Sequence, residues 1–212
     1  NELLNNHEER MVSSRILSYD DGGNPQEISD ATGTVSTTVY GYQGQTAIAE
    51  FANAKASEVA AFVFDDYSDF EDLKTRDPAW TSNGNGPMYL NDGVLLLENG
   101  QISRTIPDID KGVLELDVML DSETGDTGTI QLLSGTATTF AWQFGPDGRF
   151  YAMDGGLYSP VNASYQKYKW YHIRIEWDQV AGTWFIYVDG TRYPQNDFFD
   201  AGQGAVNQML FD

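Results

Sequence analysis

Short apolar runs alternate with turn residues along this sequence, and the alternation becomes regular from about residue 64. Candidate strands recur roughly every 8 to 15 residues, a spacing typical of a β-sandwich or jelly roll. In the clearest run, 171–177, odd-numbered positions are apolar and even-numbered positions are polar, so one face of the strand is buried. The run 183–188 is apolar on both faces, which predicts a central strand covered on both sides.

Turns rich in Asp, Asn and Gly separate these runs. Asp-Gly and Asn-Gly pairs favour tight hairpins, because both central residues of such a turn need positive φ. They occur at 92–93, 99–100, 147–148 and 189–190. The pattern therefore predicts strands at residues 88–90, 94–97, 101–105, 112–120, 128–133, 139–144, 149–153, 170–178, 183–188 and 208–211.

The first 60 or so residues differ from the rest, because their strand-like runs are weaker. Residues 3–16 have a weak helical pattern, and a polar strand pair is predicted at 25–29 and 33–40. The Ala-rich stretch 47–63 fits helix or strand on propensity alone. We therefore expect two parts, residues 1–60 and 64–212.

The charge balance narrows the classes of partner. The 212 residues carry 32 acidic and 12 basic side chains, a formal net charge of −20. Such a charge repels nucleic acid and anionic membrane surfaces. No apolar run approaches the roughly 20 residues of a membrane span, so neither nucleic-acid binding nor membrane insertion is expected.

Cysteine is absent, which excludes thiolate metal sites and cysteine nucleophiles. No signal peptide is visible, and the chain opens with Asn1 and stops at Asp212, directly after a strand-like run. We interpret both ends as cuts and expect the sequence to be a piece of a longer polypeptide.

The first part resembles the YD repeats of RHS-type bacterial polypeptides. The resemblance rests on YDDGGN at 19–24, DATG at 30–33, YGY at 40–42 and AIAEFANA at 47–54. The last two segments look like the close of such a repeat in Bacteroidetes-type surface proteins. The resemblance implies that one repeat needs stacked neighbours, so the rest of the parent polypeptide would pack on residues 1–60. It also implies a secreted or cell-surface protein, exported through the outer membrane by the type IX route.

The second part resembles laminin-G-like, concanavalin-A-like jelly rolls. WYHIRIEWD at 170–178 and GTWFIYVDG at 182–190 look like their signature hairpin, and FDDYSDFED at 64–72 looks like their first strand. The resemblance implies an all-β sandwich but says little about a ligand. Such modules close with a final strand that pairs near their beginning. Here that strand is either cut off after Asp212, or the fold is closed differently.

Glu115 and Asp117 are candidate catalytic residues of a glycoside hydrolase, because their side chains point to one face of a predicted strand. Retaining glycosidases need two carboxyl groups about 5 Å apart. Laminarinase-like jelly rolls present Glu-x-Asp-x-x-Glu, whereas Met119 and Leu120 stand where the second Glu should fall. The catalytic partner is therefore missing.

A jelly-roll polysaccharide lyase needs a base, usually His or Tyr, with Arg and Gln neutralising a uronate. The sequence has two histidines, His7 and His172, and no Gln-x-His pattern. His172 is predicted to lie on the surface of a strand. The net charge also disfavours an anionic polymer substrate. We predict that the protein is not an enzyme.

Clustered carboxylates indicate a candidate calcium site, because Ca²⁺ binds six to eight oxygen ligands. Jelly-roll modules often hold a structural Ca²⁺, so Ca²⁺ is the expected cofactor. The predicted ligands lie at the entrance of the second part: Asp65, Asp66, Asp69, Glu71 and Asp72. A second acidic loop contains Asp121, Glu123 and Asp126. The alternative for both clusters is solvated turn residues.

Aromatic and amide side chains gather between residues 139 and 170, within and before a long Tyr-rich loop. Sugars stack on aromatic rings and form hydrogen bonds with Asn, Asp and Gln around them. The predicted ligand-binding residues are Trp142, Tyr151, Tyr158, Asn162, Tyr165 and Tyr168, with Gln143 and Gln166 nearby. For any single aromatic the alternative is core packing.

We therefore predict a non-catalytic extracellular module that binds a glycan or another extracellular partner, or acts in adhesion. Two alternatives stay open. One is a structural spacer or plug of an RHS-type shell that binds nothing. The other is a glycan-degrading jelly-roll enzyme.

Overall fold

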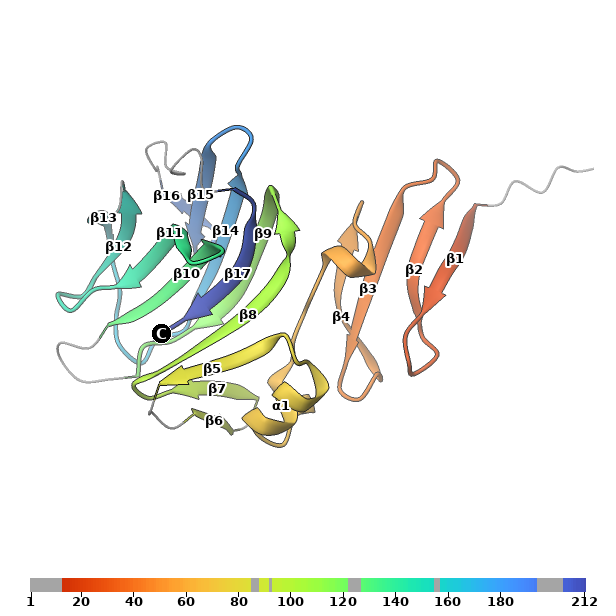
Figure 1. Ribbon diagram of the computed structural model, residues 1–212, viewed down its shortest axis with the longest axis horizontal. Coiled ribbons are helices and arrows are strands. Elements are labelled where there is room, and N and C mark those ends of the chain that lie inside the picture. Colours follow the sequence, from red (N-terminus) through yellow and green to blue (C-terminus); the bar gives the residue numbers. More distant parts are fainter. Residues whose placement is uncertain (1–12, 85–87, 92, 122–126, 155–156, 194–203) are drawn as a thin grey trace, which may run out of the picture. The chain divides into compact units, whose positions relative to one another are not determined.

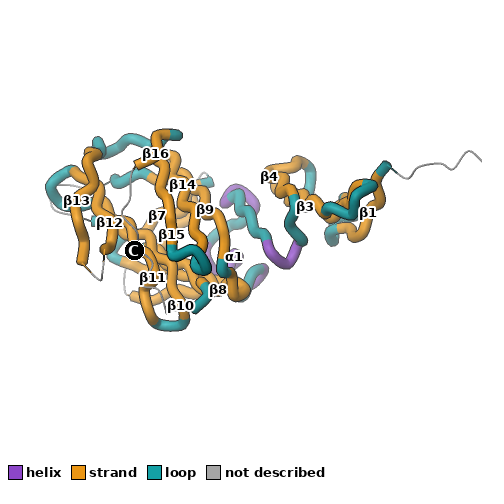
Figure 2. Tube along the Cα trace, turned by 90° about the horizontal axis from the view of Figure 1, so that it is seen from above, coloured by secondary structure: helices purple, strands orange, loops and turns teal. Residues whose placement is uncertain are grey.

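The computed structural model describes residues 13–84, 88–91, 93–121, 127–154, 157–193 and 204–212, which fold almost entirely into β-strands (Figures 1 and 2). The predicted all-β jelly-roll class is confirmed. The chain divides into two compact units: residues 1–68 with 90–95, and residues 69–89 with 96–212. Within the described part of the chain, no helix has the length and apolar character needed to cross a membrane.

The first unit contains an antiparallel meander of four strands in chain order. These are β1 (Ser14–Tyr19), β2 (Pro25–Asp30), β3 (Val35–Gly41) and β4 (Thr46–Ala52). The predicted strand pair at 25–29 and 33–40 corresponds to β2 and β3. The expected helix at 3–16 lies mostly outside the described residues, and its last residues belong to strand β1 instead. In the ambiguous stretch 47–63, β4 is followed by a 3-10 turn at Ala56–Glu58.

This meander has little core of its own. Among its described residues only Thr37 and Gly41 are fully buried, and the Thr37 hydroxyl donates a hydrogen bond to the Ala54 carbonyl (2.8 Å). Turns are instead held by carboxylates. Asp30 accepts hydrogen bonds from the Thr32 and Thr34 amides (2.8 and 2.9 Å). A hydrogen bond from the Thr32 hydroxyl, followed by these amide bonds, lowers the pKa of Asp30.

The second unit is a sandwich of two antiparallel sheets (Figure 1). The seven-stranded sheet has the order β13 (Leu157–Ser164), β12 (Arg149–Asp154), β11 (Ala137–Phe144), β10 (Gly128–Ser134), β17 (Val206–Phe211), β8 (Gly100–Ile109) and β5 (Trp80–Gly84). The four-stranded sheet has the order β16 (Thr191–Tyr193), β15 (Thr183–Val188), β14 (Tyr171–Asp178) and β9 (Lys111–Val118). A separate hairpin pairs β6 (Met88–Asn91) with β7 (Val94–Leu97).

The core lies between the two sheets and is dominated by aromatic rings. Phe150 is at its centre, with ring centroids of Trp142 and Phe144 at 5.1 Å and those of Tyr165 and Tyr171 at 5.5 Å. Such pairs contribute about 0.5–1.5 kcal/mol each beyond the area they bury. The predicted alternation in 171–177 is confirmed, because the apolar residues of β14 all face this core.

The last strand, β17, lies between β10 and β8 and not at an edge of the sheet. Phe211 pairs with Ile102 of β8, and Ile130 of β10 pairs with Phe211 from the other side. The chain thus pairs back near the beginning of the sandwich, as the resemblance implies for a final strand.

The segment 64–72, expected as the first strand of the sandwich, is helical instead. It contains a 3-10 turn (Phe64–Asp66) and the start of helix α1 (Phe70–Arg76). The Asp69 side chain accepts a hydrogen bond from the Asp72 amide (2.9 Å), which caps α1. Phe70 and Leu73 bury the inner side of this helix. The cap and this apolar spacing outweigh the strand propensity of the aromatic residues.

Candidate functional site

The outer face of the seven-stranded sheet carries amides, hydroxyls and two tyrosines. Most of these side chains alternate with residues that face the core, so they point away from it. A bulge in β11 pairs Thr138 with Leu133 and turns it to the same side, and the β5 residues are placed by their pairing with Gln101 and Ser103. We call this surface the amide–tyrosine face. Its described members are Thr81, Asn83, Gln101, Ser103, Gln131, Thr138, Gln143, Arg149, Tyr151, Met153, Tyr158, Asn162, Gln208 and Leu210.

Hydrogen bonds connect polar members of this face across the strands. Ser103 lies 2.8 Å from the Thr81 hydroxyl and accepts a bond from the Gln208 amide at 2.9 Å. The Thr138 hydroxyl donates to Gln131 (3.0 Å). These bonds fix the orientation of side chains that are only partly buried, so the face is ordered before any ligand arrives.

Tyr151 is held by contacts on two sides. A Cβ atom at Gly145 would lie 2.3 Å from Cε2 of Tyr151, so the ring packs directly against this glycine. The Tyr151 hydroxyl donates to Asp147 Oδ2 (3.0 Å), and this bond raises the pKa of Tyr151. The ring is therefore a fixed platform near the β12 end of the face.

Tyr158, on β13, is 40% exposed, and its pairing partner on β12 is Met153. Burial raises the pKa of Tyr158, and the negative charge of Asp212 adds to the shift.

The structure brings together only part of the predicted ligand-binding set. Tyr151, Tyr158 and Asn162 share the amide–tyrosine face with Gln143. Trp142 and Tyr165 are buried in the core, with 0% and 7% exposure. They offer no ring face to a ligand, so the interpretation of these two residues as sugar contacts is corrected.

Tyr168 is exposed but lies outside the face, in the loop before β14. Its side chain is 61% exposed and its backbone has a left-handed φ of 60°. The Tyr168 amide donates to the Leu120 carbonyl (3.0 Å), and the neighbouring Tyr165 hydroxyl donates to the Gly145 carbonyl (2.6 Å). The loop is thus anchored to the sandwich.

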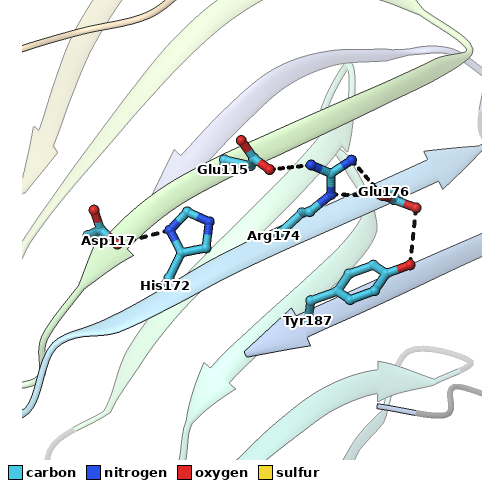
Figure 3. A network of polar contacts seen from close by, with 6 residues as sticks. All are labelled: Glu115, Asp117, His172, Arg174, Glu176 and Tyr187. Carbon is cyan, nitrogen blue, oxygen red and sulfur yellow. Dashed lines mark hydrogen bonds and ion pairs between the residues drawn. The ribbon is translucent and has the colours of Figure 1, made fainter. Parts of the chain in front are cut away.

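The outer face of the four-stranded sheet is charged instead (Figure 3). Arg174 of β14 forms ion pairs with Glu115 of β9 and with Glu176 (2.7 Å), and the Tyr187 hydroxyl lies 3.4 Å from Glu176. The hydrogen bond to Glu176, followed by that to Glu115, raises the pKa of Arg174. Burial alone would lower it.

The charged face also contains Glu115 and Asp117, the candidate catalytic carboxylates. Glu115 and Asp117 each face a basic side chain on the adjacent strand, because β9 and β14 pair in the register Glu115–Arg174 and Asp117–His172. His172 Nδ1 lies 3.0 Å from Asp117. The Arg174 guanidinium occupies the space between the Glu115 and Glu176 carboxylates (Figure 3), which is where a sugar ring would have to enter.

The predicted calcium ligands are not gathered around one point. Asp66 accepts hydrogen bonds from backbone amides, Asp69 caps α1, and Glu71 and Asp72 form ion pairs along α1 with Lys74 (2.6 Å) and Arg76 (3.7 Å). No three acidic or His side chains in the described ranges are arranged to hold a metal ion. In the second acidic loop Glu123 and Asp126 lie outside the described residues. Calcium binding stays a prediction.

Asp66 has a structural role that the sequence did not indicate. Its carboxylate accepts the amides of Tyr42 (2.9 Å) and Gln43 (2.7 Å), which have left-handed φ values of 53° and 59°. Two successive amides of this kind form a small anion-binding nest. Asp66 thereby stabilises a turn that two non-glycine residues would otherwise leave strained.

Replacing Asp66 with alanine should loosen this turn. We expect the Tyr42 and Gln43 amides to exchange with deuterium faster, with a fall of about 1 kcal/mol in local opening free energy, because a charged acceptor is lost. Asp21→Ala, at an exposed turn of the same unit, removes the same charge and serves as the control. Unchanged protection of both amides in Asp66→Ala would contradict this role.

Comparison with known proteins finds solved structures with a similar fold. No family model matches the sequence, and no curated protein matches it. A sialidase structure matches with a TM-score of 0.66 at 18% identity, covering 85% of this chain and 17% of the sialidase. The carbohydrate-binding module CBM66 from Bacillus subtilis has a TM-score of 0.47 at 16% identity, covering 63% of this chain and 87% of that one.

A β-glucanase from Bacillus licheniformis has a TM-score of 0.46 at 12% identity, covering 62% of this chain and 77% of that one. The similar structures are carbohydrate-binding and glycan-active jelly rolls. At these identities the likeness shows the fold alone. Because the chain spans only 17% of the sialidase it matches, the activity of that whole protein does not transfer.

Several members of the amide–tyrosine face were absent from the predicted site. Gln131 and Gln208 come from β10 and β17, far from the Tyr-rich stretch in sequence. The strand pattern is visible in the sequence, because Gln131 lies between Ile130 and Leu132, and Met209 and Leu210 follow Gln208. Their gathering on one face depends on the sheet order, which a single sequence does not reveal.

Proposed function

We propose that this protein is a non-catalytic, extracellular glycan-binding module and that the amide–tyrosine face is its binding surface. The observation that carries the proposal is the presence of Tyr151, Tyr158, Asn162 and Gln143 on one side of one sheet. Tyrosine rings suit the C–H faces of sugars, and amides serve as both donor and acceptor for their hydroxyls.

The extent of this face favours a chain of sugars over a single one. Its polar members run from β13 to β5, which is six inter-strand spacings or about 29 Å. Because contacts are distributed over the whole sheet, affinity should rise with the length of the oligosaccharide until the face is filled.

The absence of catalysis is supported by the charged network on the opposite face. A retaining mechanism needs two carboxyl groups about 5 Å apart with the sugar between them. Arg174 lies between Glu115 and Glu176 and pairs with both. A glycan-degrading enzyme remains the alternative, and release of reducing sugar from a bound polysaccharide would favour it.

Substitution of Tyr151 tests the proposed function. The full chain and the Tyr151→Ala variant would be run through gels containing β-glucan, xylan, levan, alginate or hyaluronan. We expect at least one polymer to retard the wild type, and Tyr151→Ala to weaken that binding on the order of tenfold, about 1.4 kcal/mol, through loss of an aromatic platform.

The control is Tyr19→Ala, which removes an exposed tyrosine (58%) from strand β1 of the first unit. It should leave the retardation unchanged. Equal losses in both variants, or no retardation by any polymer, would contradict glycan binding by this face.

The second candidate is a structural spacer of an RHS-type shell. It is favoured by the sparse burial in the first unit, which suggests that further repeats of a parent polypeptide pack on residues 1–60. In this view the protein is a secreted or surface component exported by the type IX route. A melting temperature indifferent to every polysaccharide would favour the spacer.

A further inference from the structure

We infer that the amide–tyrosine face takes an uncharged glycan and discriminates against chains that carry carboxylate or sulfate groups. This inference rests on the proposed function and specifies the class of ligand. It follows from the charged group that stands beside Tyr151 and from where the basic side chains of the sandwich lie.

Tyr151 has a carboxylate next to it. The Tyr151 hydroxyl bonds to Asp147 at 3.0 Å. A sugar stacked on the Tyr151 ring would thus lie within a few ångströms of a negative charge. Sugar hydroxyls can donate to this carboxylate, whereas a uronate or a sulfate would be repelled.

The single basic member of the face is already neutralised. Among the described members only Arg149 is cationic, and its Nε lies 3.7 Å from Asp147 Oδ2. An acidic ligand would have to compete with Asp147 for this guanidinium. The face therefore offers an acidic chain no unpaired cation to compensate for its loss of hydration.

Three basic side chains of the sandwich are on the other sheet and one on β8 is paired, while Lys167 lies in the loop between β13 and β14. Lys111, Arg174 and Arg192 belong to the four-stranded sheet, where Lys111 pairs with Asp178 (2.6 Å) and Arg192 stacks on Phe185 (3.9 Å). Arg104 pairs with Asp77 (3.1 Å). The formal net charge of −20 adds a long-range repulsion of acidic polymers.

The protonation state of the two tyrosines also fits an uncharged ligand. The pKa values of Tyr151 and Tyr158 are both raised, so both phenols stay protonated and neutral at pH 9. Since neither phenol titrates between pH 6 and 9, the affinity for a neutral glycan should be flat over this range. It should also depend little on salt, because no ion pair forms with the ligand.

The test uses polymer pairs that differ only in charge: methyl-esterified pectin against polygalacturonate, and β-glucan against carboxymethyl β-glucan. Binding of the full chain would be measured by affinity electrophoresis and calorimetry at low and high NaCl. We expect the uncharged member of a bound pair to bind at least tenfold more tightly at low salt, and the difference to shrink as salt screens the repulsion.

The Asp147→Asn variant isolates the cause. It keeps an oxygen for the Tyr151 hydroxyl but removes the charge beside the ring. Relative to the wild type, its affinity for the carboxylated polymer should rise about threefold more than its affinity for the uncharged polymer, the effect of one unit charge at roughly 6 Å in water. Asp117→Asn, which removes a charge from the opposite sheet, is the control and should change neither.

The outcomes separate the two proposals. Equal or tighter binding of the acidic member, with a loss of affinity at high salt, would overturn the inference and leave glycan binding intact. Failure of both members of every pair, together with every polymer in the gels, would overturn the proposed function and this inference with it.

Discussion

Replacing Trp142 with alanine is expected to lower the free energy of unfolding by about 3–5 kcal/mol, the usual cost of truncating a large buried aromatic. Trp142 is 0% exposed and its ring stacks on Phe150 at 5.1 Å. In a sandwich of this size the melting temperature should fall on the order of 10 °C. Thermal unfolding followed by near-ultraviolet circular dichroism would measure the loss.

Trp142→Phe is the matched variant. The Trp142 indole nitrogen is buried without a hydrogen-bond partner among the described residues. Phenylalanine keeps a ring against Phe150 and removes this unsatisfied donor, so it should cost only about 1–2 kcal/mol. A Trp142→Ala protein that melts like the wild type but fails to bind glycan would restore the interpretation of Trp142 as a ligand contact.

The second large effect is expected at Gly112, where a methyl group has no room. A Cβ atom there would lie 2.2 Å from Cζ2 of Trp177, the residue paired with Gly112 across β9 and β14. Gly112→Ala must therefore displace the indole, which also donates a hydrogen bond to the Ile109 carbonyl (3.3 Å). Overpacking of this kind costs about 1–3 kcal/mol, measurable by urea denaturation.

A double-mutant cycle with Trp177→Phe would show whether the clash is the cause. Phenylalanine lacks the outer part of the indole that Gly112 approaches, so Gly112→Ala should cost much less in the Trp177→Phe background. If Gly112→Ala is equally destabilising in both backgrounds, the cost comes from the backbone of β9 and not from contact with Trp177.

The alternation of apolar and polar residues predicted the sandwich well. The same alternation also indicates that Trp142 is a core residue and not a ligand contact. Phe140, Trp142 and Phe144 alternate along β11 and share one face, which marks that face as core. The number of aromatic residues in the 139–170 stretch does not show which of them face the core. Tyr151, between core residues Phe150 and Ala152, has the opposite phase and faces outward.

Other features depend on information that one sequence does not hold. The pairing of Glu115 with Arg174 follows from the register of β9 against β14, strands separated by more than 50 residues. The acidic run 65–72 suggested calcium because its carboxylates are close in sequence. On a helical segment successive side chains point in different directions, and Asp69, Glu71 and Asp72 each contact a different partner on α1.

The central position of β17 has a consequence for the order of folding. Until residues 206–211 are synthesised, β10 and β8 each have an unpaired edge, and the two halves of the seven-stranded sheet have no strand to join them. The joining contacts are distant in sequence, as between Asn207 and Asp108 (3.2 Å). Such long-range pairing slows folding and leaves exposed edges open to other chains. A nascent sandwich is therefore most vulnerable to aggregation just before its last strand leaves the ribosome.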